Sequence, residues 1–246
     1  MRQNIQYKDY DFEGEETLRA ISEAGNFNEW MYDSIKEFCT GNILEIGSGI
    51  GNISAFFIRE KAKIQLSDIR KQYRSYLVKV FPENEVHNID IVAKDFAQRH
   101  RNLLVQFDTV FSLNVVEHVE DDKAAIANMA KLLKPGGRLV ILVPAYQCLF
   151  NHFDFALDHF RRYTRSSLIK AFPAELKPVK SWYFNFAGIF GWFLVGNLAR
   201  KKAIPRSNMR LYNLFTTIFR VVDKLIFHKA GLSVIVVARK INNVVN

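Results

Sequence analysis

The chain has 246 residues, of which 49% are apolar and 24% are charged. These proportions are ordinary for globular proteins and argue against a disordered chain or a protein with many membrane spans, and the length suits one large domain or one domain with an insertion. The net charge of +9 lies in the last third, where residues 177–246 hold 12 Lys and Arg against Asp223 alone, which predicts an anionic partner such as phospholipid, lipid diphosphate, nucleic acid or an acidic carrier protein.

The two cysteines, Cys39 and Cys148, are far apart and have no C-x-x-C or histidine-rich companion. This spacing predicts neither a metal site nor a disulfide framework, and it suits a reducing cytosol. Residues 1–11 carry several charges and no apolar core of a secretory signal peptide, so we expect the protein on the cytoplasmic side.

Helix and strand patterns then alternate along the chain. Residues 15–23 and 28–38 have helical spacing, and the second segment places Trp30, Met31, Ile35 and Phe38 near one face, which is typical of core packing. Five short apolar runs predict a mostly parallel sheet with right-handed crossovers, whose ligands bind beyond the carboxyl ends of the strands. These runs span residues 42–47, 63–67, 85–90, 107–113 and 138–143.

Residues 176–184 and 231–238 predict a sixth and a seventh strand, with an insertion between them at the edge of the sheet. The 17 residues of 182–198 are almost wholly apolar and aromatic. They are at the lower limit for a membrane span, which favours an interfacial or buried hairpin. Arg200, Lys201 and Lys202 follow as a basic cluster that suits phosphate head groups.

The second half of the insertion predicts a helix with an apolar stripe and basic flanks. Two interpretations fit this pattern: a helix packed on the rest of the domain, or a helix lying on an anionic membrane surface. The neighbouring apolar segment favours the membrane. The stripe comprises Leu211, Leu214, Phe215, Ile218, Phe219, Val222, Leu225 and Ile226, with Arg210, Thr217, Arg220 and Lys224 on other faces.

The strongest motif is the first predicted strand, which runs into Gly47, Gly49 and Gly51. Glycines let a backbone turn sharply and approach a ligand, although a plain strand-to-helix turn has the same triplet. Glu45 lies in this otherwise apolar strand, where a buried carboxylate is costly unless a cation or a donor compensates it. Asp68 ends the second strand, where a carboxylate can accept hydrogen bonds from both hydroxyls of a ribose. The motif therefore predicts a nucleoside site.

The segments at 44–51, 107–119 and 133–139 resemble the motifs of class I S-adenosylmethionine-dependent methyltransferases, and the resemblance covers roughly residues 28–175 and the last strand. It implies a Rossmann-like α/β fold with a seven-stranded, mostly parallel sheet, helices on both faces, an antiparallel last strand and a helical insertion between strands six and seven. The expected parts are N-terminal helices over 1–40, a methyltransferase domain over 41–183 and 230–241, and the insertion over 184–229. An NAD-dependent oxidoreductase is disfavoured, because the glycines do not form G-x-G-x-x-G.

The resemblance also implies S-adenosylmethionine as the cofactor and S-adenosylhomocysteine as its product. In the family, the residue matching Glu45 faces the amino-acid end of the cofactor, and the residue matching Asp68 holds the ribose. Asp90, at the end of the third strand, is positioned to meet the adenine amino group. The expected cofactor-binding residues are Glu45, Gly47, Ser48, Gly49, Gly51, Asp68, Ile69, Asp90, Ile91, Leu113, Asn114 and His118.

Residues 144–164, after the fifth strand, should form the acceptor side of the site. His118, His152 and His159 are the candidate general bases if the acceptor must lose a proton. Paired arginines can bind a phosphate or carboxylate, although ion pairs that tie the loop to the domain are an equal alternative. Glu117 is expected to cap or position its loop. The expected substrate-binding residues are Tyr146, His152, Asp154, Arg161, Arg162 and Tyr163.

This loop and the last strand look like those of a branch of bacterial methyltransferases associated with lipid-linked glycan and surface-polysaccharide pathways. We therefore expect O-methylation of a membrane-associated lipid, glycolipid or polyketide-like acyl substrate by an enzyme peripheral to the inner face of the membrane. Two alternatives stay open. One is a nucleic-acid methyltransferase, which is disfavoured because the chain has no Asn/Asp-Pro-Pro-Tyr motif. The other is a non-catalytic module that binds S-adenosylmethionine as a regulatory ligand.

Overall fold

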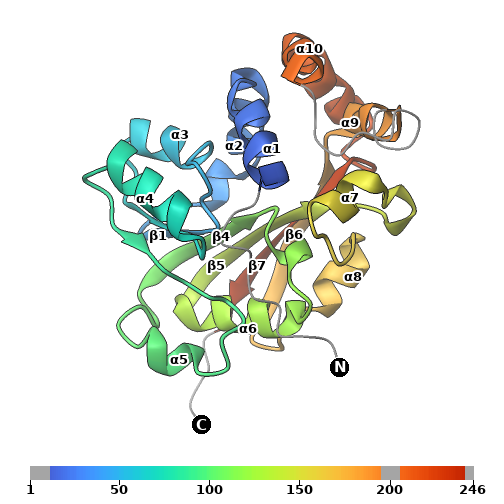
Figure 1. Cartoon of the computed structure of the whole chain (residues 1–246). Helices are drawn as coiled ribbons and strands as arrows, with labels where there is room; N and C mark the ends of the chain where they lie inside the picture. The colour runs from blue at the N-terminus through green and yellow to red at the C-terminus, as the bar shows by residue number, and fades with distance from the viewer. Residues whose placement is uncertain (1–11, 195–205, 242–246) are drawn as a thin grey trace, which may run out of the picture.

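A computed structural model describes residues 12–194 and 206–241 (Figure 1). These residues form a seven-stranded sheet surrounded by helices. The strands are β1 (Ile43–Ile46), β2 (Ile64–Ser67), β3 (Val86–His87), β4 (Phe107–Leu113), β5 (Leu133–Pro144), β6 (Leu176–Phe184) and β7 (Ser233–Lys240). The helices before β5 are α1 (Phe12–Ser22), α2 (Gly25–Ile35), η1 (Lys36–Phe38), α3 (Ser54–Arg59), α4 (Lys71–Val80), α5 (Phe96–Arg99), η2 (Val116–His118) and α6 (Asp122–Leu132). Those after it are η3 (Gln147–Leu149), α7 (His152–Ala156), α8 (Arg165–Lys170), α9 (Phe186–Trp192) and α10 (Arg206–Leu225).

The order of the strands across the sheet is β3-β2-β1-β4-β5-β7-β6. The first five strands pair in parallel, and β7 lies antiparallel between β5 and β6. The strand order reverses between β1 and β4, so the carboxyl ends of these two strands flank the position where ligands of such sheets bind. The predicted Rossmann-like fold, with its antiparallel last strand and its helical insertion, is confirmed.

Apolar side chains fill both faces of the sheet. On one face, Trp30 and Ile35 of α2 pack with Phe57 of α3 and Leu77 of α4. On the other face, α5, α6 and α8 cover β1, β4 and β5, and Met129 of α6 is fully buried there. The central strands are hydrophobic on both sides for this reason, as expected of a parallel sheet that helices enclose.

The strand predicted over residues 85–90 is shorter in the structure, where β3 spans only Val86–His87. The backbone turns away after it, because the side chain of Asp90 accepts a hydrogen bond from the Val92 N–H at 3.0 Å, which closes a local turn. The predicted sixth strand agrees with β6, and β7 begins and ends two residues later than the predicted seventh strand.

The insertion between β6 and β7 contains α9 and α10, which gather with α1 and α2 at one end of the sheet (Figure 1). The inner face of α10 is formed by Met209, Tyr212, Thr216 and Asp223, all of which are buried or partly buried. Two ion pairs hold the helix to its neighbours: Arg210 Nη2 lies 2.8 Å from Glu23 Oε2, and Arg220 pairs with Asp33 of α2.

The predicted apolar stripe of α10 is therefore only partly directed at a neighbour. Phe219 and Val222 are partly buried, but Leu214 and Leu225 are 71% and 70% exposed. Most of the other stripe residues are also exposed, to smaller fractions. The helix meets the domain with a mixed polar and aromatic face and turns its apolar face outward. No helix among the described residues is long and apolar enough to cross a membrane. The cluster of Arg200, Lys201 and Lys202 lies outside the described residues.

Asp223 joins α10 to the start of α9. Its carboxylate is fully buried and accepts hydrogen bonds from the backbone N–H groups of Asn185 at 2.6 Å and Phe186 at 2.8 Å. Asn185 has a left-handed backbone with φ of 67°, and its side chain accepts a hydrogen bond from the Gly188 N–H at 2.8 Å. The single acidic residue of the basic last third thus fixes how the two inserted helices meet.

Candidate active site

The glycine-rich turn after β1 brings the backbone close to the carboxyl ends of β1 and β4. Gly47 has a φ of 76°, and a Cβ atom added there would lie 2.4 Å from Val115 Cγ2. Gly51 also has a left-handed backbone, with a φ of 81°, and its N–H donates to the Ser48 carbonyl at 2.8 Å. A larger residue at Gly47 would be strained and would clash, which explains why glycine stands there.

Two buried carboxylates lie beside this turn. Glu45 is 4% exposed and accepts a hydrogen bond from the Ser54 hydroxyl. Asp68 is 6% exposed, and its two oxygens accept hydrogen bonds from the N–H groups of Gly49 at 3.0 Å and Arg70 at 2.8 Å. Burial raises the pKa of Glu45 to about 7, and the nearby charge of Asp68 acts in the same direction. Burial also raises the pKa of Asp68. A cationic ligand between the two groups would relieve this cost.

A cavity of about 700 Å³ opens above these groups, within the usual range of ligand pockets. One end is polar and is formed by the tips of β1 and β2, including Glu45 and Asp68. The other end is apolar and lies between α1, α2, α9 and α10. The apolar walls include Leu18, Ile21, Phe27, Met31, Trp192, Met209, Tyr212, Phe215 and Phe219.

Most of the predicted cofactor-binding residues line this cavity. They are Glu45, Gly47, Ser48, Asp68, Ile69, Ile91, Leu113, Asn114 and His118. Three others do not. A Cβ atom at Gly49 would face Leu18, Gly51 packs against Phe81, and the Asp90 side chain is engaged in the turn with Val92. Their predicted contacts with the cofactor stay predictions.

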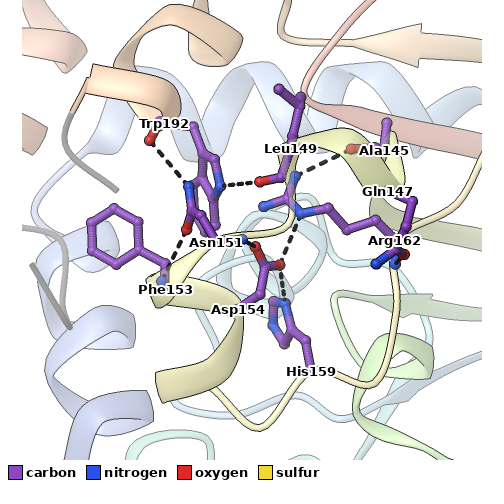
Figure 2. Close-up of polar contacts among 9 residues, drawn as sticks. All are labelled: Ala145, Gln147, Leu149, Asn151, Phe153, Asp154, His159, Arg162 and Trp192. Atoms are coloured by element: carbon purple, nitrogen blue, oxygen red, sulfur yellow. Dashed lines mark hydrogen bonds and ion pairs between the residues drawn. The ribbon is translucent and has the colours of Figure 1, made fainter. Parts of the chain in front are cut away.

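The loop after β5 contains a buried polar cluster, which Figure 2 shows. Asp154 is fully buried, and its Oδ1 atom lies 2.8 Å from His159 Nδ1 and 2.8 Å from Arg162 Nε. Its Oδ2 atom accepts a hydrogen bond from the Asn151 N–H at 2.9 Å. Arg162 Nη1 donates to the Ala145 carbonyl at 3.2 Å, and the guanidinium lies 4.5 Å from the ring centroid of Trp192. The cluster ties the loop to β5 and to α9.

The predicted substrate-binding residues separate into two groups. Arg162 and His159 line the cavity, whereas Asp154 lies behind them. Tyr146, His152, Arg161 and Tyr163 lie outside it. The Arg161 guanidinium is 2.9 Å from Asp122 Oδ2, and the Tyr163 hydroxyl donates to the same oxygen at 2.9 Å. Ion pairs thus tie both arginines to the domain, as one of the two alternatives expected, while Arg162 also borders the cavity, so its predicted contact with a ligand stays a prediction.

Tyr146 and His152 are also placed away from a ligand. The Tyr146 ring stacks on Tyr183 with centroids 4.9 Å apart, and His152 is exposed at the start of α7. His152 would have to move toward the cavity to act as a base, because a general base must reach the proton that it removes. His118 lines the cavity, but burial and the nearby His159 lower its pKa to about 3. It is neutral at physiological pH and is a weak base.

Sequence reasoning missed two sets of residues in the cavity wall. The first is Glu117, which we expected to position its loop and which instead lines the cavity with a fully buried carboxylate. Its signal was a charged residue within the apolar segment 115–119. The second set is the aromatic and apolar wall from α2 and α10, including Phe27 and Tyr212. No motif identifies these residues, because their role depends on how the insertion folds back over the sheet.

Comparison with known proteins is consistent with this geometry. Residues 44–139 match the family model described as "Methyltransferase domain". The chain is 30% identical over 125 residues to the ubiquinone/menaquinone biosynthesis C-methyltransferase UbiE of Pseudoalteromonas translucida, in an alignment that covers 46% of this chain and 48% of the relative. It is 28% identical over 111 residues to the ubiquinone biosynthesis O-methyltransferase of Erwinia tasmaniensis, with 45% of each chain covered.

The fold is shared with a solved structure described as a SAM dependent methyltransferase from Archaeoglobus fulgidus. The TM-score is 0.55 at 16% sequence identity, and the superposition covers 87% of this chain and 94% of the other. At this identity the likeness concerns the fold alone. The chain spans about half the length of the curated relatives it matches. The family match over residues 44–139 and the shared fold agree with the resemblance to class I methyltransferases, whereas the resemblance to a branch of lipid-linked glycan pathways stays a prediction.

Proposed function

Because the chain contains a class I S-adenosylmethionine-dependent methyltransferase domain, we propose that it transfers the methyl group of this cofactor to an oxygen atom of a lipid-soluble acceptor at a membrane surface. The acceptor class comprises membrane-associated lipids, glycolipids and polyketide-like acyl compounds, to which the comparisons add lipid-soluble quinones. The protein would act as a peripheral enzyme at the inner face of the membrane.

The main observation in support of the proposal is the composition of the cavity described above. Its polar end holds the buried carboxylates of Glu45 and Asp68, and its other end is walled by apolar and aromatic side chains of α2, α9 and α10. The ammonium group of S-adenosylmethionine is a cation that suits Glu45, and its ribose hydroxyls suit Asp68. An apolar acceptor suits the opposite end, because burial of apolar surface favours its binding.

The expected reaction requires mainly that the methyl donor and the acceptor are aligned and that water is excluded. Methyl transfer is an in-line displacement, in which the acceptor oxygen attacks the methyl carbon while the carbon–sulfur bond breaks and its electron pair returns to sulfur. The proton of an acceptor hydroxyl must pass to a base, for which His159 is the expected candidate in the cavity wall. Holding both reactants in one cavity supplies much of the rate by orientation. Glu45 and Asp68 would hold the donor, and the walls from Phe27 and Tyr212 would keep water away from the acceptor.

An outer apolar face supports the membrane part of the proposal. On α10, the exposed side chains recur at helical spacing, and they adjoin exposed side chains at the end of α9. The outer apolar face comprises Phe190, Phe193, Leu194, Leu211, Leu214, Phe215, Ile218, Val221 and Leu225. Lys224 and Lys229 are exposed beside it. Such a combination of apolar and basic groups is typical of helices that lie in the interface of an anionic bilayer.

The cavity and the outer apolar face meet. Leu211 and Phe215 line the cavity and are also 60% and 42% exposed, so they belong to both surfaces. An acceptor dissolved in the bilayer could therefore enter without crossing water. The names of the curated relatives, which refer to ubiquinone and menaquinone biosynthesis, support an acceptor that is soluble in lipid.

A labelling experiment tests the activity. The purified protein is incubated with S-adenosylmethionine that carries a labelled methyl group and with fractions of a native lysate. The proposal expects label in the organic-solvent fraction, and loss of that label when Asp68 is replaced by Asn. Label in the nucleic-acid fraction would support a nucleic-acid methyltransferase instead. Binding of the cofactor without label in any fraction would support a regulatory module.

Co-sedimentation with vesicles tests the membrane part. The protein should sediment with vesicles that contain phosphatidylglycerol and less with neutral phosphatidylcholine vesicles. Ile218→Glu should weaken binding at least tenfold, because Ile218 is 58% exposed in the outer apolar face. Val179→Glu is the matched control, since Val179 is 56% exposed on β6 and far from that face. Equal binding to both vesicle types by all three proteins would contradict the membrane part.

A further inference from the structure

We propose that Glu117, His118 and His159 bind a divalent metal ion, with Zn²⁺ as the best match, in the wall of the cavity. Binding of the ion is independent of the proposed methyl transfer. Its suggested use, to hold an oxygen atom of the acceptor beside the cofactor, rests on that function. The spacing of cysteines and histidines in the sequence had predicted no metal, because His159 follows His118 by 41 residues and only the fold brings them together.

The three side chains come from two segments that meet at the carboxyl edge of the sheet. Glu117 and His118 belong to η2, which follows β4, and His159 belongs to the loop after α7. One potential ligand atom of each residue lies within 4.8 Å of the other two. A zinc ion lies about 2.0–2.2 Å from nitrogen and oxygen ligands, so closing around it would draw these atoms together by roughly 1 Å. This is a side-chain adjustment.

The buried carboxylate of Glu117, which lacks a partner, is the observation that points to a ligand. The residue is fully buried, and neither of its oxygens has a hydrogen-bond partner among the described residues. An isolated buried carboxylate is very costly unless it is protonated, paired or bound to a metal. Because Glu117 lines the cavity, a metal ion can reach it.

Both histidines are oriented as metal ligands usually are. A ligating histidine normally uses its second ring nitrogen to donate to a carboxylate or a backbone carbonyl, which fixes the ring. His159 meets this condition through its Nδ1 atom, 2.8 Å from Asp154 Oδ1 (Figure 2). His118 meets it through a hydrogen bond with the backbone of Leu157. One nitrogen of each ring is thus left for an ion.

The surroundings support this arrangement. Arg162 is a buried cation of the same loop, but its guanidinium pairs with Asp154 at 2.8 Å and donates no hydrogen bond to Glu117. The two imidazole rings meet edge to face, with centroids 4.6 Å apart, which lets both address one point. Two histidines and one carboxylate form a common catalytic zinc site, in which a fourth position stays open for water or substrate. Here the open position would face the cavity.

Calorimetric titration of the full-length protein with ZnCl₂ after treatment with EDTA tests the site. Cys148 is exposed and could bind zinc on its own, so all proteins carry Cys148→Ser. We expect binding of one ion per chain, weakened at least tenfold by His159→Ala and by Glu117→Gln. His152→Ala is the matched control, because His152 belongs to the same loop but is exposed outside the cavity, and its loss should leave zinc affinity unchanged.

Thermal unfolding gives a second measurement that remains valid if a variant is less stable. Zinc should raise the melting temperature of the parent and of His152→Ala, but not that of Glu117→Gln. X-ray absorption of the zinc-loaded parent should show nitrogen and oxygen ligands only. The proposal is overturned if the parent binds no zinc, or if His152→Ala weakens binding as much as His159→Ala. Absence of methyl transfer with zinc binding intact would refute the proposed function and leave the metal site standing.

Discussion

Replacement of Glu45 by glutamine tests whether the buried carboxylate pair suits a cation. Glu45 is 4% exposed beside Asp68, and its pKa is raised from 4.5 to about 7, first by burial and then by the charge of Asp68. In the folded protein without cofactor, Glu45 therefore holds its proton more tightly than in the unfolded chain. The stability that this proton contributes is fully present below pH 4.5 and is lost as the pH rises through about 7.

The magnitude follows from the two pKa values. A rise from 4.5 to about 7 corresponds to about 3 kcal/mol of unfolding free energy, because each tenfold change in proton affinity is worth about 1.4 kcal/mol. Glutamine has nearly the same shape and does not ionise. Between pH 5 and pH 8, we expect the wild type to lose about 2–3 kcal/mol of unfolding free energy relative to Glu45→Gln.

Urea unfolding of both proteins at pH 5 and pH 8, without cofactor, measures this difference. S-adenosylmethionine should offset the loss of the wild type at pH 8, and it should bind the variant about tenfold more weakly, since a charge-assisted contact is removed. Glu37→Gln is the control, because Glu37 forms only an exposed pair with Lys180, worth about 1 kcal/mol at most. A stability difference between wild type and Glu45→Gln that does not change with pH would refute the reasoning.

Three further substitutions test the fold around the site by urea unfolding at pH 7. Gly47→Ala should cost about 1–3 kcal/mol of unfolding free energy and weaken cofactor binding, because the φ there is 76° and the new Cβ would lie 2.4 Å from Val115. Gly25→Ala is the control, since its Cβ meets nothing within 4 Å, and equal effects of the two changes would contradict the steric argument. Asp223→Ala should cost about 2–4 kcal/mol of unfolding free energy, because two N–H groups lose their acceptor, and Asp223→Asn should cost less. An alanine variant as stable as the wild type would show that these hydrogen bonds are not needed. Asp154→Ala should cost about 3–5 kcal/mol, because it leaves Arg162 buried without its partner. Asp95→Ala, which removes an exposed pair with Arg99, should cost much less, and similar losses in the two variants would disprove the role of burial.

The sheet was predictable because its strands carry local signals. An apolar run followed by glycines predicts a buried strand and a tight turn, and the residues around Gly47 have this structure. The sixth strand agrees with its predicted range for the same reason. The third strand does not, because two residues of pairing followed by an Asp90 turn leave too little pattern to define an end.

The site was predictable only where regular strands supply it. Glu45 lies near the end of β1 and Asp68 directly follows β2, so their approach follows from the parallel sheet alone. The meeting of Glu117 with His159 depends on how a loop of irregular structure folds, for which periodicity gives no rule. The stripe of α10 was recognised, but its direction was not, because a period of 3.6 residues identifies an apolar face without stating what covers it.

The antiparallel strand β7 has a consequence for how this fold can change. β6 ends and β7 begins at the same edge of the sheet, paired as Phe184 with Ser233, so the chain between them leaves and re-enters the domain at one place. That place borders the cavity whose polar end holds Glu45 and Asp68. A segment of another length between Phe184 and Ser233 could therefore replace α9 and α10 while the pairing of β6 with β7 stays intact, and the wall of the cavity would change with it.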